Sequence, residues 1–276
     1  MHCIDRLDVM IAYSCNLACR GCISISDQVR DGVEPFENLV AELDRWKTLI
    51  VPGVTAIFGG EPCLHPKLVE ICQHVRTVWP DTVIRLITNG YLLDNFDAEH
   101  WFNLGKLEIQ VSVHRKDHEQ VLNQKIKNIL SKRKAWRIST HQSTGEHKQM
   151  QWQYDSVSIY KSIFKEFVVP YQQHNNQLLP WNSDPVESHK ICGAANTPVL
   201  YKGKLYKCPA VANVIDITKQ NWFNYQAIDI DGDLGGFVQS IGVPEPVCGQ
   251  CPNRAQAVVI DHFDKKNVVV RQKNIN

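Results

Sequence analysis

The sequence predicts an α/β fold in which a parallel sheet occupies roughly the first 170 residues and a small cysteine-rich module follows. Short apolar runs alternate with amphipathic helical segments about six times in this region. Such alternation is typical of βαβ units that build a parallel sheet. Polar or glycine-rich residues follow most of the predicted strands, and beyond residue 171 the composition changes and four further cysteines appear.

The predicted helices have apolar residues at helical spacing, so that one face of each is available for a core. Asp117 is suited to cap one of them, and Pro80 ends another. The expected helices span residues 35–51, 67–78, 98–104, 117–131 and 156–164.

The predicted strands are short apolar runs, and the segment 142–154 between them is too polar to assign. In parallel α/β folds the functional site is built at the carboxyl ends of the strands, whether the sheet is doubly wound or closed toward a barrel. The expected strands span residues 7–14, 54–58, 83–87, 107–113, 136–140 and 166–169.

Composition excludes several classes of protein. The chain has 276 residues with 43% hydrophobic and 21% charged residues, which is ordinary for a globular protein. A formal net charge of +1 gives no indication of a nucleic-acid or membrane-surface partner. We find neither an apolar run long enough to span a membrane nor a signal-peptide pattern. We therefore expect a cytoplasmic protein whose clustered cysteines bind metal rather than form disulfides.

Three of the cysteines lie in one short loop after the first predicted strand. Cys15, Cys19 and Cys22 are separated by three and then two residues. Thiolates in such a loop suit an iron–sulfur cluster, and three ligands would leave one iron without a protein ligand. Three buried thiols, or a zinc site that borrows a fourth ligand, are the alternatives.

Four cysteines form a second group. Cys192 and Cys208 flank a hairpin signal centred on Gly203, and Cys248 and Cys251 are separated by two residues. Two separated pairs of this kind form either an iron–sulfur site or a four-cysteine zinc site.

The first loop, followed by Gly59-Gly60-Glu61-Pro62 and Thr88-Asn89-Gly90 at the next two strand ends, resembles the radical S-adenosylmethionine (radical SAM) superfamily. The resemblance implies a partial (β/α)6 TIM-like barrel over residues 1–175. It also implies that Cys15, Cys19 and Cys22 bind a [4Fe-4S] cluster whose open iron is chelated by SAM.

Residues for SAM follow from the same resemblance. Glu61 would contact the methionyl amine, since a carboxylate is the natural partner of an ammonium group, and the two glycines would allow a close approach of the backbone. Gly21 departs from the family pattern, where the residue before the last cysteine is often aromatic. The expected SAM contacts are Gly59, Gly60, Glu61, Pro62, Thr88, Asn89 and Ser112.

Behind such a barrel, the late cysteines resemble a twitch domain, a shortened SPASM module. This implies a linker over residues 176–190 and a small α+β module containing a β-hairpin over residues 191–276. An auxiliary [4Fe-4S] cluster would be held by Cys192, Cys208, Cys248 and Cys251, and four cysteine ligands would leave it no open iron, so that it serves electron transfer.

Three further residues are candidates for catalysis. His114 and His141 follow predicted strands, and histidine has a suitable pKa to accept a proton from an oxidised alcohol. Cys63 directly follows the glycine-rich turn and is either a hydrogen-atom donor or a buried core residue.

The resemblance implies a radical SAM oxidoreductase. SAM would be cleaved to a 5′-deoxyadenosyl radical that abstracts a hydrogen atom from a small polar substrate, such as a sugar, an aminocyclitol or a nucleotide. The auxiliary cluster would accept the second electron, and flavodoxin or ferredoxin would reduce the first cluster. The alternatives are a peptide-modifying enzyme, an epimerase, and an iron–sulfur or zinc-binding electron-transfer protein.

Overall fold

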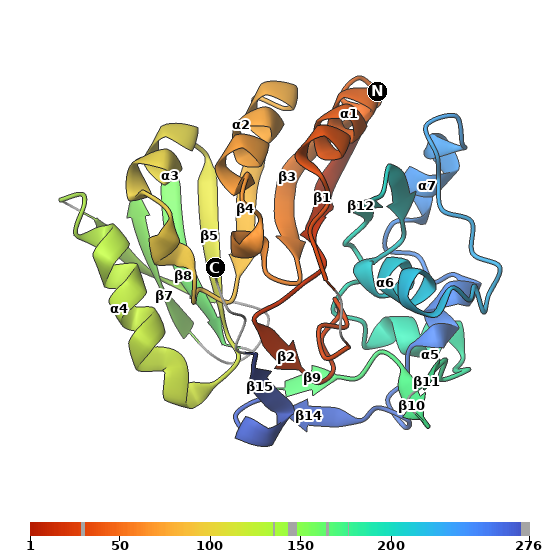
Figure 1. Ribbon diagram of the computed structural model, residues 1–276. Coiled ribbons are helices and arrows are strands. Elements are labelled where there is room, and N and C mark those ends of the chain that lie inside the picture. Colours follow the sequence, from red (N-terminus) through yellow and green to blue (C-terminus); the bar gives the residue numbers. More distant parts are fainter. Residues whose placement is uncertain (29–30, 135, 143–147, 164–165, 176, 272–276) are drawn as a thin grey trace.

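A computed structural model describes residues 1–28, 31–134, 136–142, 148–163, 166–175 and 177–271 (Figure 1). Its centre is a nine-stranded sheet with the order β13-β12-β1-β3-β4-β5-β8-β7-β6. Neighbouring strands from β12 to β8 run parallel. The parallel strands are β12 (Val199–Tyr201), β1 (His2–Ala12), β3 (Ile50–Gly59), β4 (Val83–Thr88), β5 (Leu107–Val113) and β8 (Val157–Ile163).

Helices cover one face of this sheet, as Figure 1 shows for α1 to α4. The face that each turns inward is apolar and joins the main core, as Trp46, Ile71 and Leu122 do. Burial of these side chains provides the main stabilisation of the layered arrangement. The covering helices are α1 (Phe36–Trp46), α2 (Leu68–Val78), α3 (Ala98–Leu104) and α4 (Glu119–Leu130).

The predicted fold class is confirmed: an α/β chain with a mostly parallel sheet and helices on one face is the architecture of a partial TIM-like barrel. The four expected βα units up to residue 130 all form.

Beyond residue 130 the structure differs from the expected alternation of strands and helices. The segment 156–164 was expected to be helical but forms β8, which pairs in parallel with β5. In so short a segment, apolar residues fit the period of a helix as well as that of a strand. Here the pairing with β5 makes the segment a strand. The strand expected at 136–140 does form, as β6 (Arg137–Gln142), but it pairs antiparallel with the unassigned segment β7 (Lys148–Tyr154). β6 therefore adds to the edge of the sheet and does not begin another βα unit.

Smaller elements gather beside the carboxyl ends of the parallel strands. The expected strand 166–169 forms as β9 (Glu166–Val168), but it pairs with β14 (Val259–Asp261) outside the main sheet. β2 (Leu17–Cys19) pairs with β15 (Val268–Val270), and Figure 1 shows both pairs close together.

The cysteine-rich part of the chain begins beside this region. The expected hairpin forms from β12 and β13 (Lys204–Tyr206), and β12 extends the main sheet by pairing with β1. The domain boundaries at 175 and 190 stay a prediction. The other elements here are β10 (Gln172–His174), β11 (Gln177–Leu179), α5 (Pro185–Lys190), α6 (Pro209–Thr218) and α7 (Leu234–Ser240), with short 3-10 turns such as η4 (Pro246–Gln250).

Across the described residues, we find no helix with the length and apolar character needed to cross a bilayer.

Trp46 joins the hairpin to the helical layer. Its indole Nε1 donates to the Gly203 carbonyl oxygen at 3.1 Å, and the contact is buried. We expect Trp46→Phe to lower the free energy of unfolding by about 2 kcal/mol or more, because a buried acceptor loses its partner. Chemical denaturation measures the change. Trp222→Phe is the matched control, since that indole donates to Gln220 at the surface and its loss should cost less than about 0.5 kcal/mol.

Candidate active site

The first cysteine loop lies at the carboxyl end of β1. Cys15 and Cys19 are buried, and Cys22 is half-buried. Burial raises the pKa of the Cys15 thiol to about 12 and that of Cys19 well above its ordinary value. The backbone N–H of Leu17 points at the Cys15 sulfur at 3.4 Å. Buried thiols that become thiolates need a compensating positive group, and a metal centre supplies one.

Gly21 has a structural reason to be glycine. Its φ is +80°, and a Cβ at this position would lie 3.4 Å from Phe167 and 3.5 Å from Val169. The loop therefore packs directly against β9 and its continuation. An aromatic residue would not fit at this position.

Glu61 follows β3 and is fully buried. Its carboxylate accepts hydrogen bonds from the backbone N–H of Cys63 at 2.9 Å, the Thr88 hydroxyl at 2.6 Å and the backbone N–H of Asn89 at 2.8 Å. Within the described residues no cation pairs with it, and burial raises its pKa. A buried carboxylate without a cation is costly unless a positive group is supplied.

Gly59 and Gly60 bring this carboxylate to the cysteine loop. The backbone N–H of Gly60 donates to the Ala12 carbonyl at 2.8 Å, and that of Glu61 donates to the Ser14 carbonyl at 2.9 Å. A Cβ on either glycine would lie 2.2 Å from one of these carbonyl oxygens. Only glycine permits this approach. Pro62 begins the 3-10 turn that follows.

Asn89 completes the link to the thiols. Its side-chain Nδ2 donates to the Asn16 oxygen at 2.6 Å and lies 3.7 Å from the Cys15 sulfur. The structure therefore brings together three sequence segments, the cysteine loop and the turns that follow β3 and β4. These segments carry most of the predicted cofactor residues.

Ser112 lies near the carboxyl end of β5 and is buried. Its register partner on β8 is Ser162, which is equally buried. Sequence reasoning missed Ser162 because the segment was expected to be helical. The alternation of small and apolar residues from 157 to 163 was the available signal.

His114 follows β5 and contacts a residue that sequence reasoning missed, His262. The two Nδ1 atoms are 3.4 Å apart, and the Nε2 of His262 donates to the Arg20 carbonyl oxygen at 2.8 Å. In a neutral His262, Nδ1 therefore carries no proton. The proton between the two rings then belongs to Nδ1 of His114, which is the donor. Burial, with His262 beside it, lowers the pKa of His114 to about 3.

The other two catalytic candidates lie elsewhere. The backbone of His141 pairs with Gln149 on the edge hairpin, and its side chain lies outside the described residues. Cys63 is buried in the main core, with its sulfur 3.5 Å from the Thr88 hydroxyl. Burial and the neighbouring Glu61 raise the pKa of this thiol well above its ordinary value.

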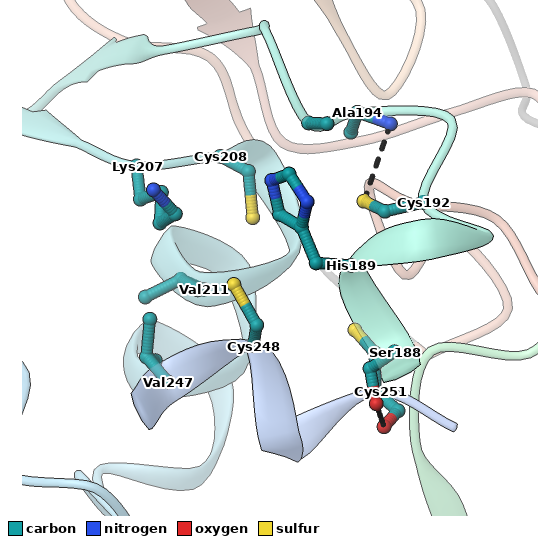
Figure 2. A pocket seen from close by; sticks show the side chains of 11 residues that line it. Ser188, His189, Cys192, Ala194, Lys207, Cys208, Val211, Val247, Cys248 and Cys251 are labelled. Atoms are coloured by element: carbon teal, nitrogen blue, oxygen red, sulfur yellow. Dashed lines mark hydrogen bonds between the residues drawn. The ribbon is translucent and has the colours of Figure 1, made fainter. Parts of the chain in front are cut away.

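The four late cysteines line one pocket, and Figure 2 shows their thiols around the ring of His189. α5 leads to Cys192, Cys208 caps α6, and η4 contains Cys248. Burial raises the pKa of Cys208 to about 12. His189 was not predicted, and within the described part of the chain its buried Nε2 has no hydrogen-bond partner.

A single zinc ion requires its ligand atoms to lie at short distances from one another. Tetrahedral zinc with bonds of about 2.3 Å places its sulfurs roughly 3.8 Å apart. Among the described residues, the one set of three ligand atoms mutually within 4.8 Å comes from Cys19, His114 and His262. In the part of the chain that the structure describes, neither cysteine group contains three sulfurs that meet this distance limit.

Comparison with known proteins agrees with this geometry. Residues 9–139 match the Radical SAM superfamily. This match covers a little under half of the chain. The GTP 3′,8-cyclase of Microcystis aeruginosa is 35% identical over 118 residues, which cover 41% of this chain and 35% of that protein. The GTP 3′,8-cyclase of Crocosphaera subtropica is 27% identical over 120 residues, with 41% and 34% covered.

The chain thus spans about a third of the length of these curated relatives. The crystal structure of BtrN in complex with AdoMet and 2-DOIA is similar over nearly the whole chain. Its TM-score is 0.53 at 15% identity, with 91% of this chain and 94% of BtrN covered. This likeness supports the fold.

The raised pKa of Glu61 predicts a pH dependence of stability. A group whose pKa is higher in the folded state stabilises the fold below its unfolded pKa, about 4.5, and this contribution is lost as pH rises through the folded pKa. We expect the ligand-free protein to lose stability as pH rises from about 4.5, and Glu61→Gln to remove part of that slope. Denaturation at several pH values measures the difference; parallel curves for both proteins would contradict it.

Proposed function

We propose that the chain is a radical SAM enzyme that cleaves SAM and abstracts a hydrogen atom from a small polar substrate. The observation that carries this proposal is the meeting of the cysteine loop with the buried carboxylate of Glu61. An electron carrier has no need of an uncompensated carboxylate beside its cluster loop. A SAM enzyme needs a partner there for an ammonium group.

The residues present fit both cofactors. Cys15, Cys19 and Cys22 would hold a [4Fe-4S] cluster, and three thiols gathered in one largely buried loop fit such a centre. Glu61 would bind the methionyl ammonium of SAM through a charge-assisted contact. When bound, the cluster and SAM supply an electron and a 5′-deoxyadenosyl radical.

The chain's own residues position these groups. Thr88 and Asn89 hold the Glu61 carboxylate, and Asn89 also fixes Asn16 in the loop. Gly59, Gly60 and Pro62 form the turn that lets the backbone approach SAM. Ser112 remains the proposed contact for a polar group of SAM at the end of β5.

The late cysteines support net oxidation. Cys192, Cys208, Cys248 and Cys251 would hold an auxiliary [4Fe-4S] cluster, with the orphaned Nε2 of His189 beside it. With all its irons ligated by cysteine, this cluster would accept an electron from the substrate radical. A twitch-type module and an oxidoreductase class follow from this assignment and are part of the proposal.

Oxidation of an alcohol also requires a proton acceptor. His114 is the better placed candidate in the described structure, because Nδ1 faces His262 and its Nε2 therefore has the lone pair. Burial lowers the pKa of this ring to about 3, which keeps it neutral at physiological pH but makes it a weak base in the ligand-free protein. His141 remains a second candidate.

A polar cleft beside the loop supports a small polar substrate. Its lining combines polar side chains, such as Arg20, Asp27, Tyr171 and Gln173, with apolar ones, such as Val169 and Trp181. Hydrogen-bonding groups of this kind suit a sugar, an aminocyclitol or a nucleotide, and the matched relatives are named for a reaction of GTP. The first cluster would receive its electron from a flavodoxin or ferredoxin.

An epimerase or a peptide-modifying enzyme is the alternative activity. Epimerisation requires a thiol that returns a hydrogen atom to the substrate, and Cys63 is the candidate. The Cys63 thiol is buried in the core and hydrogen-bonded to the Thr88 hydroxyl. Because it is held away from a substrate in this way, dehydrogenation is favoured over epimerisation. Solvent deuterium at carbon in the product would reverse that choice.

Anaerobic reconstitution tests the first step of the proposal. We expect about eight irons per chain and SAM-dependent formation of 5′-deoxyadenosine with dithionite. Cys19→Ala should abolish 5′-deoxyadenosine, whereas Cys251→Ala should lower iron to about four and keep SAM cleavage. Cys3→Ala is the control, because Cys3 is exposed and lies at the opposite end of β1 from the first cysteine loop. Intact clusters without any 5′-deoxyadenosine would reject an enzymatic role.

The second test concerns Glu61. We expect Glu61→Gln to weaken SAM binding about 10- to 100-fold, because a charged partner of the ammonium is replaced by a neutral amide. Equilibrium binding to the reconstituted protein measures the change. Glu70→Gln on the exposed face of α2 is the matched control and should bind as the unaltered protein does. Equal affinity of both variants would remove Glu61 from the SAM site.

A further inference from the structure

Three metal-ligating side chains from distant parts of the chain meet beside the first cluster loop. Cys19 belongs to β2, His114 follows β5, and His262 follows β14. One ligand atom from each lies within 4.8 Å of the other two. Cys19 and His262 are buried and His114 is half-buried. The proposed radical mechanism accounts for Cys19 and His114 separately but not for this cluster of three.

The distance between the two rings, long for a hydrogen bond, is also the one that two imidazoles on a single ion would have. The Nδ1 atoms are 3.4 Å apart. Nitrogen donors and acceptors in proteins usually approach to about 2.9–3.0 Å. Two imidazoles bound to one tetrahedral ion with bonds of 2.0–2.1 Å have their nitrogens roughly 3.3–3.4 Å apart.

The surroundings orient His262 as a ligand. Its Nε2 donates to the Arg20 carbonyl oxygen at 2.8 Å, so its Nδ1 presents a lone pair toward His114. A backbone carbonyl on the second ring nitrogen is the usual outer partner of a metal-bound histidine. The ring also stacks on Phe167, with centroids 3.9 Å apart and an interplanar angle of 11°.

The third ligand is fixed by backbone pairing. Cys19 is the register partner of Val268 in the β2–β15 pair, and the backbone N–H of Arg20 donates to the Asn267 carbonyl at 2.9 Å. His262 comes from the same carboxyl-terminal segment. The site is therefore assembled whenever this segment is paired with the loop, and ion binding requires little reorganisation.

We propose that the cluster-free chain binds one divalent ion of the zinc class through the Cys19 sulfur and the Nδ1 atoms of His114 and His262. One thiolate and two imidazoles form a borderline ligand set that selects Zn²⁺ or Co²⁺ over Mg²⁺ and Ca²⁺. On binding, the Cys19 thiol releases its proton to solvent, and the proton on His114 Nδ1 is replaced by one on Nε2. The fourth position of the ion is left to water.

One consequence rests on the proposed function. Cys19 is a proposed ligand of the first [4Fe-4S] cluster, and its sulfur cannot serve this ion and the cluster together. Occupancy by zinc would therefore block cluster assembly until the ion is removed. Ion binding itself does not depend on any SAM chemistry.

Anaerobic titration of the cluster-free full chain with Co²⁺ tests the site. Any cobalt taken up by the late cysteines is common to all variants. The comparison is therefore made on the difference between variants in two absorption signals, the thiolate-to-cobalt charge-transfer band and the bands of tetrahedral Co²⁺. We expect His262→Ala to lose one equivalent of Co²⁺, with affinity at that site reduced at least about 100-fold. His174→Ala, on exposed β10, is the control and should retain it.

If His262→Ala fails to fold, the unfolding temperature of a second variant tests the same site. We expect Zn²⁺ to raise the unfolding temperature of the unaltered protein, and His114→Asn, which alters a half-buried ligand and leaves His262 in place, to lose most of that rise. Equal cobalt binding and equal zinc stabilisation in all variants would overturn the proposal.

Cluster reconstitution in the presence of Zn²⁺ tests the consequence. One equivalent of Zn²⁺ should lower the iron content of the unaltered protein and leave that of His262→Ala unchanged. Unchanged iron in both proteins would overturn the competition. A cobalt result as expected, together with no SAM cleavage, would reject the proposed enzyme and leave the ion site standing.

Discussion

The candidate site depends on the contact between the turn after β3 and the chain just before Cys15. Two backbone hydrogen bonds, to Ala12 and Ser14, hold the turn there, and a Cβ at Gly59 or Gly60 would prevent both. This contact continues the parallel pairing of β1 and β3 beyond the regular strands. It places the Glu61 carboxylate beside the first thiol, and Thr88 and Asn89 from the next strand end then fix the carboxylate.

Both cysteine groups share one physical property with Glu61. Burial raises the pKa of Cys19 in the first group and of Cys208 in the second, and it raises the pKa of the Glu61 carboxyl as well. Buried groups of this kind usually lower stability unless a counter-charge is present. Because such groups gather at two places in this chain, we expect the fold to gain stability when positively charged ligands bind there.

Much of this arrangement could be predicted from the sequence. The cysteine loop and the turns after β3 and β4 are short, local signals, and the parallel sheet brings their strand ends together without further information. His262 could not be found in this way, because it reaches the loop only through pairing of β14 with β9 and of β15 with β2. Ser162 was missed because the apolar residues of the seven-residue segment Val157–Ile163 are spaced in a way that fits a short helix as well as a strand.

The pairing of β15 with β2 also has a consequence for the order of events during synthesis. β15 follows every other element along the chain, yet it covers the loop that carries Cys19. On the ribosome, the barrel strands emerge long before the strand that closes this loop. The thiols of this loop therefore stay uncovered on the growing polypeptide until β15 has emerged and paired with β2.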